Sequence, residues 1–550
     1  MKARRPRTFS SATSGAIGLG LVLATAGCGD GRTDSRSTGT AGTQVGGTLT
    51  VVGAEEPAGF NVKIPDKQSA TNLAVMSALW RGAWIVRPDF QFALNTDLLT
   101  SAEMINTDPQ TVVYKINPRA VWSDGAPVDA DDFIYNWETA RPGARDADGT
   151  PTQSVALPGG GDPIASVTGS DGGRTVTVVY KARNVQWKAG LLFNYLIPAH
   201  VARRVGFNSG FARFDPTLEV SNGPYKIGSF NPGRDLTLVR NERFWGAPAT
   251  LDRVVFRFTG EEAGATALKS GEGDLLVGHA VPDLIAQLRQ TRDITTRVTP
   301  TLSQEYVGFN LRNELLALPA VRKAFALAVD RMVDRDPTVN VVNSFLRSDR
   351  QPAYRDTSGG RYDRPDVAGA KRLLEEAGFS LGADGVYARD GKRLALRART
   401  FPEFPHEAEL QLVQAQVKQA GIELRIENAP DSVLGPQLSN GDFDVEVTLY
   451  GKNLFGSVNQ FRPGNRWGYA NPRPNELVAQ SNLELDDAER QAILDEADRI
   501  LWDDLPIVPL YQLPGLMAVR STFVNVEPNP AAPGASPFWN LERWARKAGR

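Results

Sequence analysis

The feature that most constrains the fold is a short apolar strand near the middle of the chain that leads into an amphipathic helix. The strand is expected over residues 306–310, because Tyr306 and Phe309 are residue types that favour a buried, pleated strand. The helix is expected over residues 319–331, since Pro319 suits a first helical turn and apolar residues follow at helical spacing. Long mixed α/β segments lie on both sides. The pattern predicts that the chain leaves one lobe and enters a second at this strand.

Length and composition support the same division. A chain of 550 residues exceeds what one hydrophobic core ordinarily holds, so two or more lobes are expected. Apolar residues make up 41% and charged residues 23%, which is typical of a water-soluble globular body. The formal net charge of −2 gives no reason to expect nucleic acid as a partner.

The N-terminus has the pattern of an export signal. Basic residues up to Arg7 precede an apolar run over 16–26 that is too short to remain as a transmembrane helix. Small residues then lead to Cys28, the only cysteine, and this resembles a bacterial lipobox. The resemblance implies cleavage before Cys28 and acylation, including a palmitate, that anchors the chain to the extracytoplasmic face of the cell membrane. The alternative is a plain secretory signal with an incidental cysteine. With one cysteine, neither an intrachain disulfide nor a Cys-based zinc site is expected.

Local patterns beyond the signal predict alternating strands and helices. Residues 48–52 favour a strand and residues 72–81 a helix, and Asp129 is expected to cap a further helix. In the second half, Asp363 is expected as the N-cap of a helix that ends at Gly378. Alternation of this kind predicts βα units with a sheet rich in parallel strands.

Several motifs occur in the order found in one known family. They are YVGFNLRN followed by PAVRKAFALAVDR, VWSDGAPVDADDF, SNGPY and AKRLLEEAGF, and the matches extend from Thr48 to Asn540. Together they resemble the family 5, or peptide/nickel/opine, class of solute-binding proteins that serve ATP-driven importers. The resemblance implies an α/β, two-lobed periplasmic-binding-protein type II fold of the large three-subdomain (cluster C) kind.

The resemblance also implies a domain division. The expected segments are a signal peptide at 1–27, a flexible tether at 28–47, lobe I at 48–304 with a small subdomain at about 66–200, lobe II at 305–507, and a return to lobe I at 508–550. The lobes would close on a ligand by bending at two crossover strands, near Gln304–Tyr306 and Val508–Tyr511.

The resemblance gives one expected ligand contact and one departure from it. Peptide-binding members pair the free amino group of the ligand with an aspartate, and the aligned position here is Asn453, beside Lys452. An amide supplies no countercharge, so a neutral polar ligand such as a saccharide or glycolipid headgroup stays open as an alternative to a peptide. The other expected cleft residues, for each of which core packing is the alternative, are Glu55, Tyr306, Asn310, Tyr450, Trp467 and Trp539.

Motifs for catalysis or metal binding do not stand out. The sequence has no GxxxxGK[ST] loop and no GxSxG elbow. Its three histidines, His200, His279 and His406, are dispersed and lack the spacing of a metal site. We therefore expect no enzyme activity, no metal and no cofactor.

The sequence thus predicts a monomeric, extracytoplasmic substrate-binding lipoprotein of an ABC importer. Its expected ligand is an oligopeptide or a related polar solute, and its expected partners are permease subunits and, through Cys28, the membrane. The alternative is a binding or regulatory lipoprotein of the cell envelope that has left transport and recognises a saccharide or glycolipid.

Overall fold

A computed structural model describes most of the chain. The described residues are 42–154, 162–189, 192–215, 218, 220–331, 340–400, 406–452, 459–462 and 464–548. At residues 431, 432 and 459 only the backbone is described. Cys28 and Asn453 therefore lie outside the described residues. Residues 39–550 form one compact unit. No helix in the described ranges has the length and apolar character needed to span a membrane.

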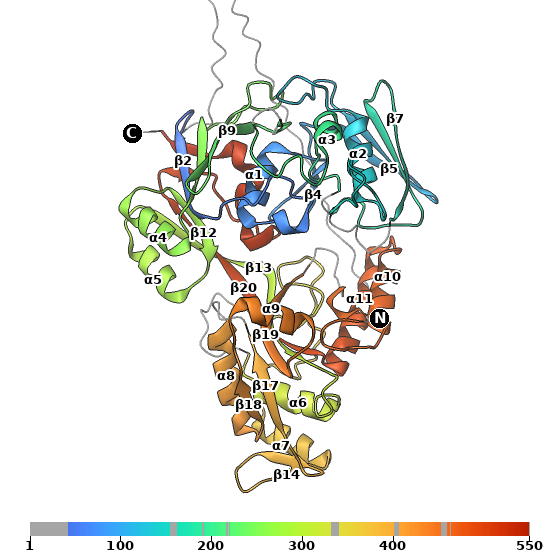
Figure 1. The fold of residues 1–550 in the computed structure, drawn as a ribbon, viewed down its shortest axis with the longest axis vertical. Coiled ribbons are helices and arrows are strands. Elements are labelled where there is room, and N and C mark those ends of the chain that lie inside the picture. Colours follow the sequence, from blue (N-terminus) through green and yellow to red (C-terminus); the bar gives the residue numbers. More distant parts are fainter. Residues whose placement is uncertain are drawn as a thin grey trace, which may run out of the picture. The chain divides into compact units, whose positions relative to one another are not determined.

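A ten-stranded mixed sheet runs through this unit (Figure 1). Its order is β18 (Glu423–Ile426), β17 (Ala395–Arg399), β19 (Val445–Gly451), β13 (Ile294–Phe309), β20 (Ile507–Arg520), β12 (Leu275–His279), β2 (Thr48–Ala54), β11 (Arg253–Phe258), β10 (Asp235–Arg240) and β9 (Tyr225–Asn231). Strand β2 is parallel to β11 and β12, and β17 is parallel to β18 and β19. The other neighbours are antiparallel, so the sheet is less rich in parallel strands than the sequence predicts.

The two longest strands connect the halves of the unit. Strands β13 and β20 pair over Ile294–Pro300 with Pro514–Arg520, and the pairing resumes in a shifted register at Gln304 with Gln512. At the break, the Thr301 hydroxyl donates to the Leu513 carbonyl at 2.7 Å. The break lies close to the predicted crossover. Pro300 and Pro514 face each other beside it, and neither has an N–H to donate to the ladder, which explains the irregular register.

Separate hydrophobic cores occupy the two ends of these strands. One core contains Leu49, Trp80 and Val254, and the other contains Phe309 and Trp502. A small third cluster packs α4 (Glu261–Ser270) and α5 (Pro282–Gln290) against β12. Because each large core is made by its own strands and helices, the fold has two lobes. The predicted residue boundaries of the lobes stay predictions.

The structure contains the predicted strand and helix at the centre of the chain, but the strand is longer and the helix shorter than predicted. Tyr306 and Phe309 are fully buried, as predicted. Helix α6 (Pro319–Ala328) ends three residues before Arg331. The Arg331 guanidinium turns inward and donates to the carbonyls of Pro509 at 2.6 Å and Val342 at 2.9 Å. Residues 329–331, which the sequence pattern included in the helix, are therefore non-helical in the structure.

A four-stranded antiparallel sheet forms a subdomain whose inward side chains, such as Tyr114 and Val178, belong to the first core. Its order is β5 (Leu99–Thr107), β6 (Gln110–Ile116), β8 (Thr175–Tyr180) and β7 (Ile164–Ser170). Helix α2 (Ala130–Ala140) packs on β7 and β8, and α3 (Ala199–Val205) packs on α2. The predicted cap of α2 is confirmed, because Asp129 and Asp132 form a reciprocal capping box.

Further helices complete the lobes. They are α1 (Ala70–Leu79), α7 (Val367–Glu376), α8 (His406–Gln419), α9 (Asp431–Ser439), α10 (Arg473–Ser481) and α11 (Asp487–Asp504), with short 3-10 turns at Pro65–Lys67, Asn459–Phe461, Pro533–Ala535 and Phe538–Arg543. Strands β3 (Trp84–Val86) and β4 (Phe92–Leu94) form a two-stranded sheet. One three-stranded sheet has the order β1 (Thr43–Gln44), β22 (Ala545–Lys547) and β21 (Phe523–Val524). Another has the order β14 (Ser380–Leu381), β15 (Tyr387–Arg389) and β16 (Lys392–Arg393).

One predicted cap is wrong. Helix α7 starts after Asp366, whose carboxylate accepts from the Gly369 N–H at 2.7 Å. Asp363 instead accepts from the Asn343 side-chain amide at 2.9 Å, which commits its carboxylate to a loop contact. Both aspartates precede residues with helical spacing. Because Asp363 contacts Asn343, Asp366 is the residue that caps the helix.

Candidate functional site

A cavity of about 970 Å³ is walled by elements of both cores. One wall comes from the end of β2, the first turn of α1 and the region where α4 and β12 meet. Another part of the lining comes from the N-terminal half of α8 and from Leu449 of β19. The crossover residues Thr301, Tyr511 and Leu513 also contribute. The cavity therefore adjoins the two strands that join the lobes.

Acidic residues from both lobes line this cavity. Glu55 follows β2, Glu261 begins α4, and Glu409 lies in the first turn of α8. Glu261 is engaged by His279, whose backbone N–H and ring Nδ1 lie 2.7 Å and 2.9 Å from its two carboxylate oxygens. Among the described residues that line the cavity, none is a lysine or an arginine.

The start of α8 is fixed by contacts to the crossover strands. His406 is buried, and its Nδ1 lies 2.6 Å from Oε1 of Glu305, a fully buried residue of β13. The Tyr511 hydroxyl of β20 donates to Oε1 of Glu409 at 3.1 Å. Both contacts tie the first turn of a lobe II helix to the strands that pass between the lobes. A change in the course of these strands would therefore displace this wall of the cavity.

Apolar side chains make up much of the remaining lining. Phe256 and Phe538 come from the first lobe, and Leu412 and Leu449 from the second. Leu449 is 41% exposed, which is high for a large apolar residue and places apolar area within reach of a ligand. Such a mixture of apolar surface and a few polar groups is typical of a site that binds an organic solute. In the described part of the chain, no group of three or more His, Cys, Asp or Glu residues is arranged to hold a metal ion.

The sequence-predicted site residues are divided among different places. Glu55 lines the cavity. Tyr306, Tyr450 and Trp467 instead pack together in the second core, with the Tyr306 ring 5.5 Å from each of the other two. Two of them contact Glu446, which accepts from the Tyr306 hydroxyl at 3.1 Å and from the Trp467 indole at 2.5 Å. Burial raises the pKa of the Glu446 carboxyl, and the nearby Arg466 guanidinium opposes that rise.

Asn310 lies at the end of β13, away from the cavity lining. Its side-chain amide donates to the carbonyls of Gly441 at 2.9 Å and Phe443 at 2.8 Å. These bonds fasten the turn that precedes β19. The structure thus gives Asn310 a positioning contact within lobe II.

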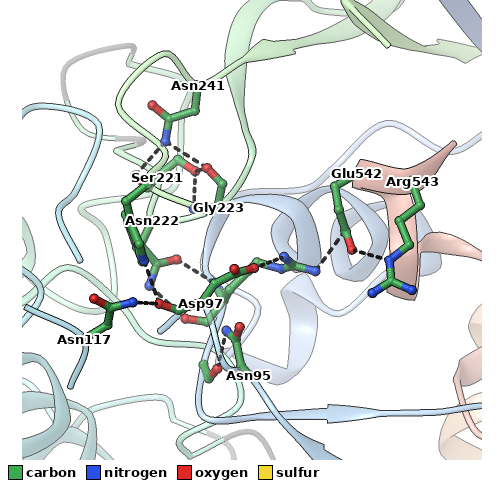
Figure 2. A network of polar contacts seen from close by, with 12 residues as sticks. Asn95, Asp97, Asn117, Ser221, Asn222, Gly223, Asn241, Glu542 and Arg543 are labelled. Carbon is green, nitrogen blue, oxygen red and sulfur yellow. Dashed lines mark hydrogen bonds and ion pairs between the residues drawn. The ribbon is translucent and has the colours of Figure 1, made fainter. Parts of the chain in front are cut away.

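Trp539 lines a second, smaller cavity of about 350 Å³ in lobe I. Charged residues in its lining are paired, since Arg81 lies 3.0 Å from Glu542 and 3.8 Å from Asp97. Figure 2 shows this network, in which the Asn117 amide also donates to the Asp97 carbonyl. The network connects the C-terminal segment to the first lobe. Trp539 is not among the residues that line the larger cavity, to which Glu55 contributes.

The sequence patterns missed His406 and Glu409 as cavity residues. One signal was available for Glu409, since an acidic residue beside Leu410 on the inward side of an amphipathic helix is unusual unless it has a partner or a function. No signal in the sequence could show that the first turn of α8 meets the crossover strands.

The two-lobed α/β fold and the cavity between its cores define a periplasmic-binding-protein type of solute-binding protein. The family described as "Bacterial extracellular solute-binding proteins, family 5 Middle" matches residues 93–469, which is more than half of the chain. The chain belongs to this family of solute-binding proteins, and the predicted resemblance is confirmed.

Named relatives differ in the solutes that their names record. The oligopeptide-binding protein OppA of Mycobacterium tuberculosis is 28% identical over 503 residues, covering 88% of this chain and 82% of OppA. A probable monoacyl phosphatidylinositol tetramannoside-binding protein of the same organism, LpqW, is 32% identical over 348 residues, covering 59% of this chain and 51% of LpqW.

Among solved structures, the periplasmic EDTA-binding protein EppA superposes with a TM-score of 0.84 at 28% identity. The superposition covers 93% of this chain and 98% of EppA. The likeness extends over nearly all of both chains, so it includes both lobes and the connection between them.

Proposed function

We propose that this protein binds oligopeptides in the 970 Å³ cavity and delivers them to the permease of an ABC importer. In this proposal it acts as a monomer, tethered through Cys28 to the extracytoplasmic face of the membrane. The observation that carries the proposal is the cavity itself. It is contained between two cores that are joined by two long strands, so bending at those strands would enclose a ligand.

The size and lining of the cavity suit a peptide. Its volume lies at the upper end of the range of about 300–1,000 Å³ seen for small-molecule sites, which leaves room for several side chains. Carboxylates and histidines supply hydrogen-bonding groups, and Phe256, Leu412 and Phe538 supply apolar contacts. The similarity to OppA over most of both chains supports the same ligand class.

The sequence alternative, a saccharide or glycolipid ligand, is favoured by one observation, the 32% identity to LpqW. That similarity covers 59% of this chain and 51% of LpqW. We keep a glycolipid as the second candidate. It predicts binding of a mannoside and no binding of peptides.

Thermal unfolding of the purified protein separates these classes. A ligand at 100 times its Kd stabilises the folded protein by about 2.7 kcal/mol, which is readily seen as a higher Tm. We expect a pool of synthetic oligopeptides to raise Tm, and a mannoside and EDTA to leave it unchanged. A rise with the mannoside alone would contradict the peptide proposal and support the second candidate.

A further inference from the structure

We propose that a contact between the lobes, outside the cavity, sets how much of the protein is closed when no ligand is bound. The contact joins the loop at residues 184–187, which follows β8 in the subdomain, to Asn482 at the end of α10 in lobe II. We call this contact the latch. The inference rests on the proposed function only in taking the lobes to close over a ligand, and the class of ligand does not enter.

Two hydrogen bonds make the latch. The Val185 N–H donates to the Asn482 carbonyl at 3.0 Å, and Gln186 Nε2 donates to Asn482 Oδ1 at 2.5 Å. Gln186 and Asn482 are 296 residues apart in the sequence, and both side chains are partly buried by the contact. The latch is therefore a second connection between the lobes, in addition to the strands β13 and β20.

The loop that forms the lobe I side of the latch is fixed within its own lobe. Gln110 of β6, which is 1% exposed, donates to the Asn184 carbonyl at 3.1 Å and accepts from the Asn184 N–H at 2.7 Å. The Gln186 N–H donates to Asn184 Oδ1 at 2.9 Å. At the other end of the loop, the Trp187 ring packs edge-to-face on Trp84 with 5.3 Å between the ring centroids. Gln186 is therefore presented to lobe II by an ordered loop.

Asn482 is likewise fixed within lobe II. It is the C-cap of α10, and its N–H donates to the Val478 carbonyl at 3.2 Å. Leu477 and Val478 are buried in the second core, and α10 packs along α11. Because each side of the latch is fixed within its own lobe, both bonds form only in one relative position of the lobes. Bending at β13 and β20 that separates the lobes would break them.

The latch lies apart from the candidate ligand site. Neither Gln186 nor Asn482 lines the cavity. Figure 1 shows α10 beneath the subdomain that carries β5 and β7, on the opposite side of the view from α8 and α4, whose residues line the cavity. The latch therefore acts on the position of the lobes without contacting a ligand. Through the closed fraction, it changes the affinity for every ligand by the same factor.

The strength of these bonds suits a reversible contact. Partly exposed amides regain hydrogen bonds to water when the lobes separate, so one such bond favours the closed state by only about fivefold. A ligand that contacts both lobes shifts the balance further toward the closed state. The latch thus favours closing without preventing opening.

Small-angle X-ray scattering of the purified protein without ligand tests this inference, because the radius of gyration increases as the lobes separate. We expect Q186A and N482A each to lower the ratio of closed to open protein by about fivefold, and so to increase the radius of gyration. N482D keeps an acceptor oxygen for Gln186, so we expect it to retain the wild-type radius. The matched control is Q480A, which changes an exposed side chain in the last turn of α10 that is not part of the latch.

Wild-type radii in both Q186A and N482A, with unchanged circular dichroism, would overturn the inference. An equal increase in Q480A would also overturn it, because the effect would then not belong to the latch. As a second readout, we expect Q186A and N482A to release the synthetic oligopeptide pool about fivefold faster than the wild type. If no oligopeptide binds the wild type, the proposed function fails, while the radii of gyration still decide whether the latch holds the lobes together.

Discussion

A single buried carboxylate, that of Asp132, connects several elements of the subdomain by hydrogen bonds. Its carboxylate accepts from the Ala199 N–H at 2.8 Å, and from the Trp122 indole and the Asp129 N–H at 3.1 Å each. It thereby joins α2, α3 and the turn before α2. Burial nevertheless raises the pKa of Asp132 from 3.8 to about 7, with the three donors opposing the rise.

This pKa predicts how stability depends on pH. Between pH 4 and 7 the folded protein keeps a proton on Asp132 that the unfolded chain releases, so the free energy of unfolding falls as the pH rises through this window. The slope contributed by Asp132 is at most about 1.4 kcal/mol per pH unit. We expect D132N to flatten the measured profile of denaturant midpoint against pH, whatever its absolute stability.

The control is D131N, which changes an exposed acid on the same helix that pairs with Arg203. It should show the same pH profile as the wild type. Identical profiles for D132N and the wild type would show that Asp132 is ionised in the folded protein throughout this window.

Tight packing between elements fixes the turn before β9, where Ser221, Asn222 and Gly223 meet the end of α1. The Asn222 N–H donates to the Leu79 carbonyl at 2.9 Å, and Ser221 Oγ donates to the carbonyl of Tyr225 at 2.5 Å. A Cβ added at Gly223 would lie 1.9 Å from the Ala78 carbonyl oxygen. Only glycine allows the turn and the helix to approach this closely.

We therefore expect G223A to lower the free energy of unfolding by about 3 kcal/mol, because neither backbone can move without losing these bonds. The control is G451A at the end of β19, where an added Cβ has no neighbour within 4 Å. Replacement of a strand glycine by alanine should leave stability unchanged or raise it by up to about 1 kcal/mol. Guanidinium unfolding followed by circular dichroism measures both. Equal midpoints for G223A and the wild type would contradict the packing argument.

The sequence predicted elements more successfully than it predicted their contacts. The strand at Tyr306 and the cap at Asp129 follow from local patterns, and both are confirmed. Aromatic residues such as Trp467 are common both in hydrophobic cores and in binding sites, so the local sequence cannot distinguish the two roles. Glu409 lines the cavity because α8 packs beside the crossover strands, and this tertiary contact cannot be read from the local sequence.

The whole molecule is organised around β13 and β20, which carry one continuous sheet through two separately packed lobes. Residues from both lobes reach the cavity beside these strands. The central claim is that this cavity is the place where a peptide binds. A substitution that fills the cavity without disturbing either core therefore gives the most direct test.

Ala408 offers such a position, because it is exposed, lies in the first turn of α8 and lines the cavity. Ala415 is exposed on the same helix outside the lining and serves as the matched control. The decisive measurement is titration calorimetry of the oligopeptide pool against A408W, A415W and the wild type. The account predicts that A408W loses at least about tenfold in affinity while A415W binds as the wild type does. Wild-type affinity in A408W, with its folded structure intact, would contradict it.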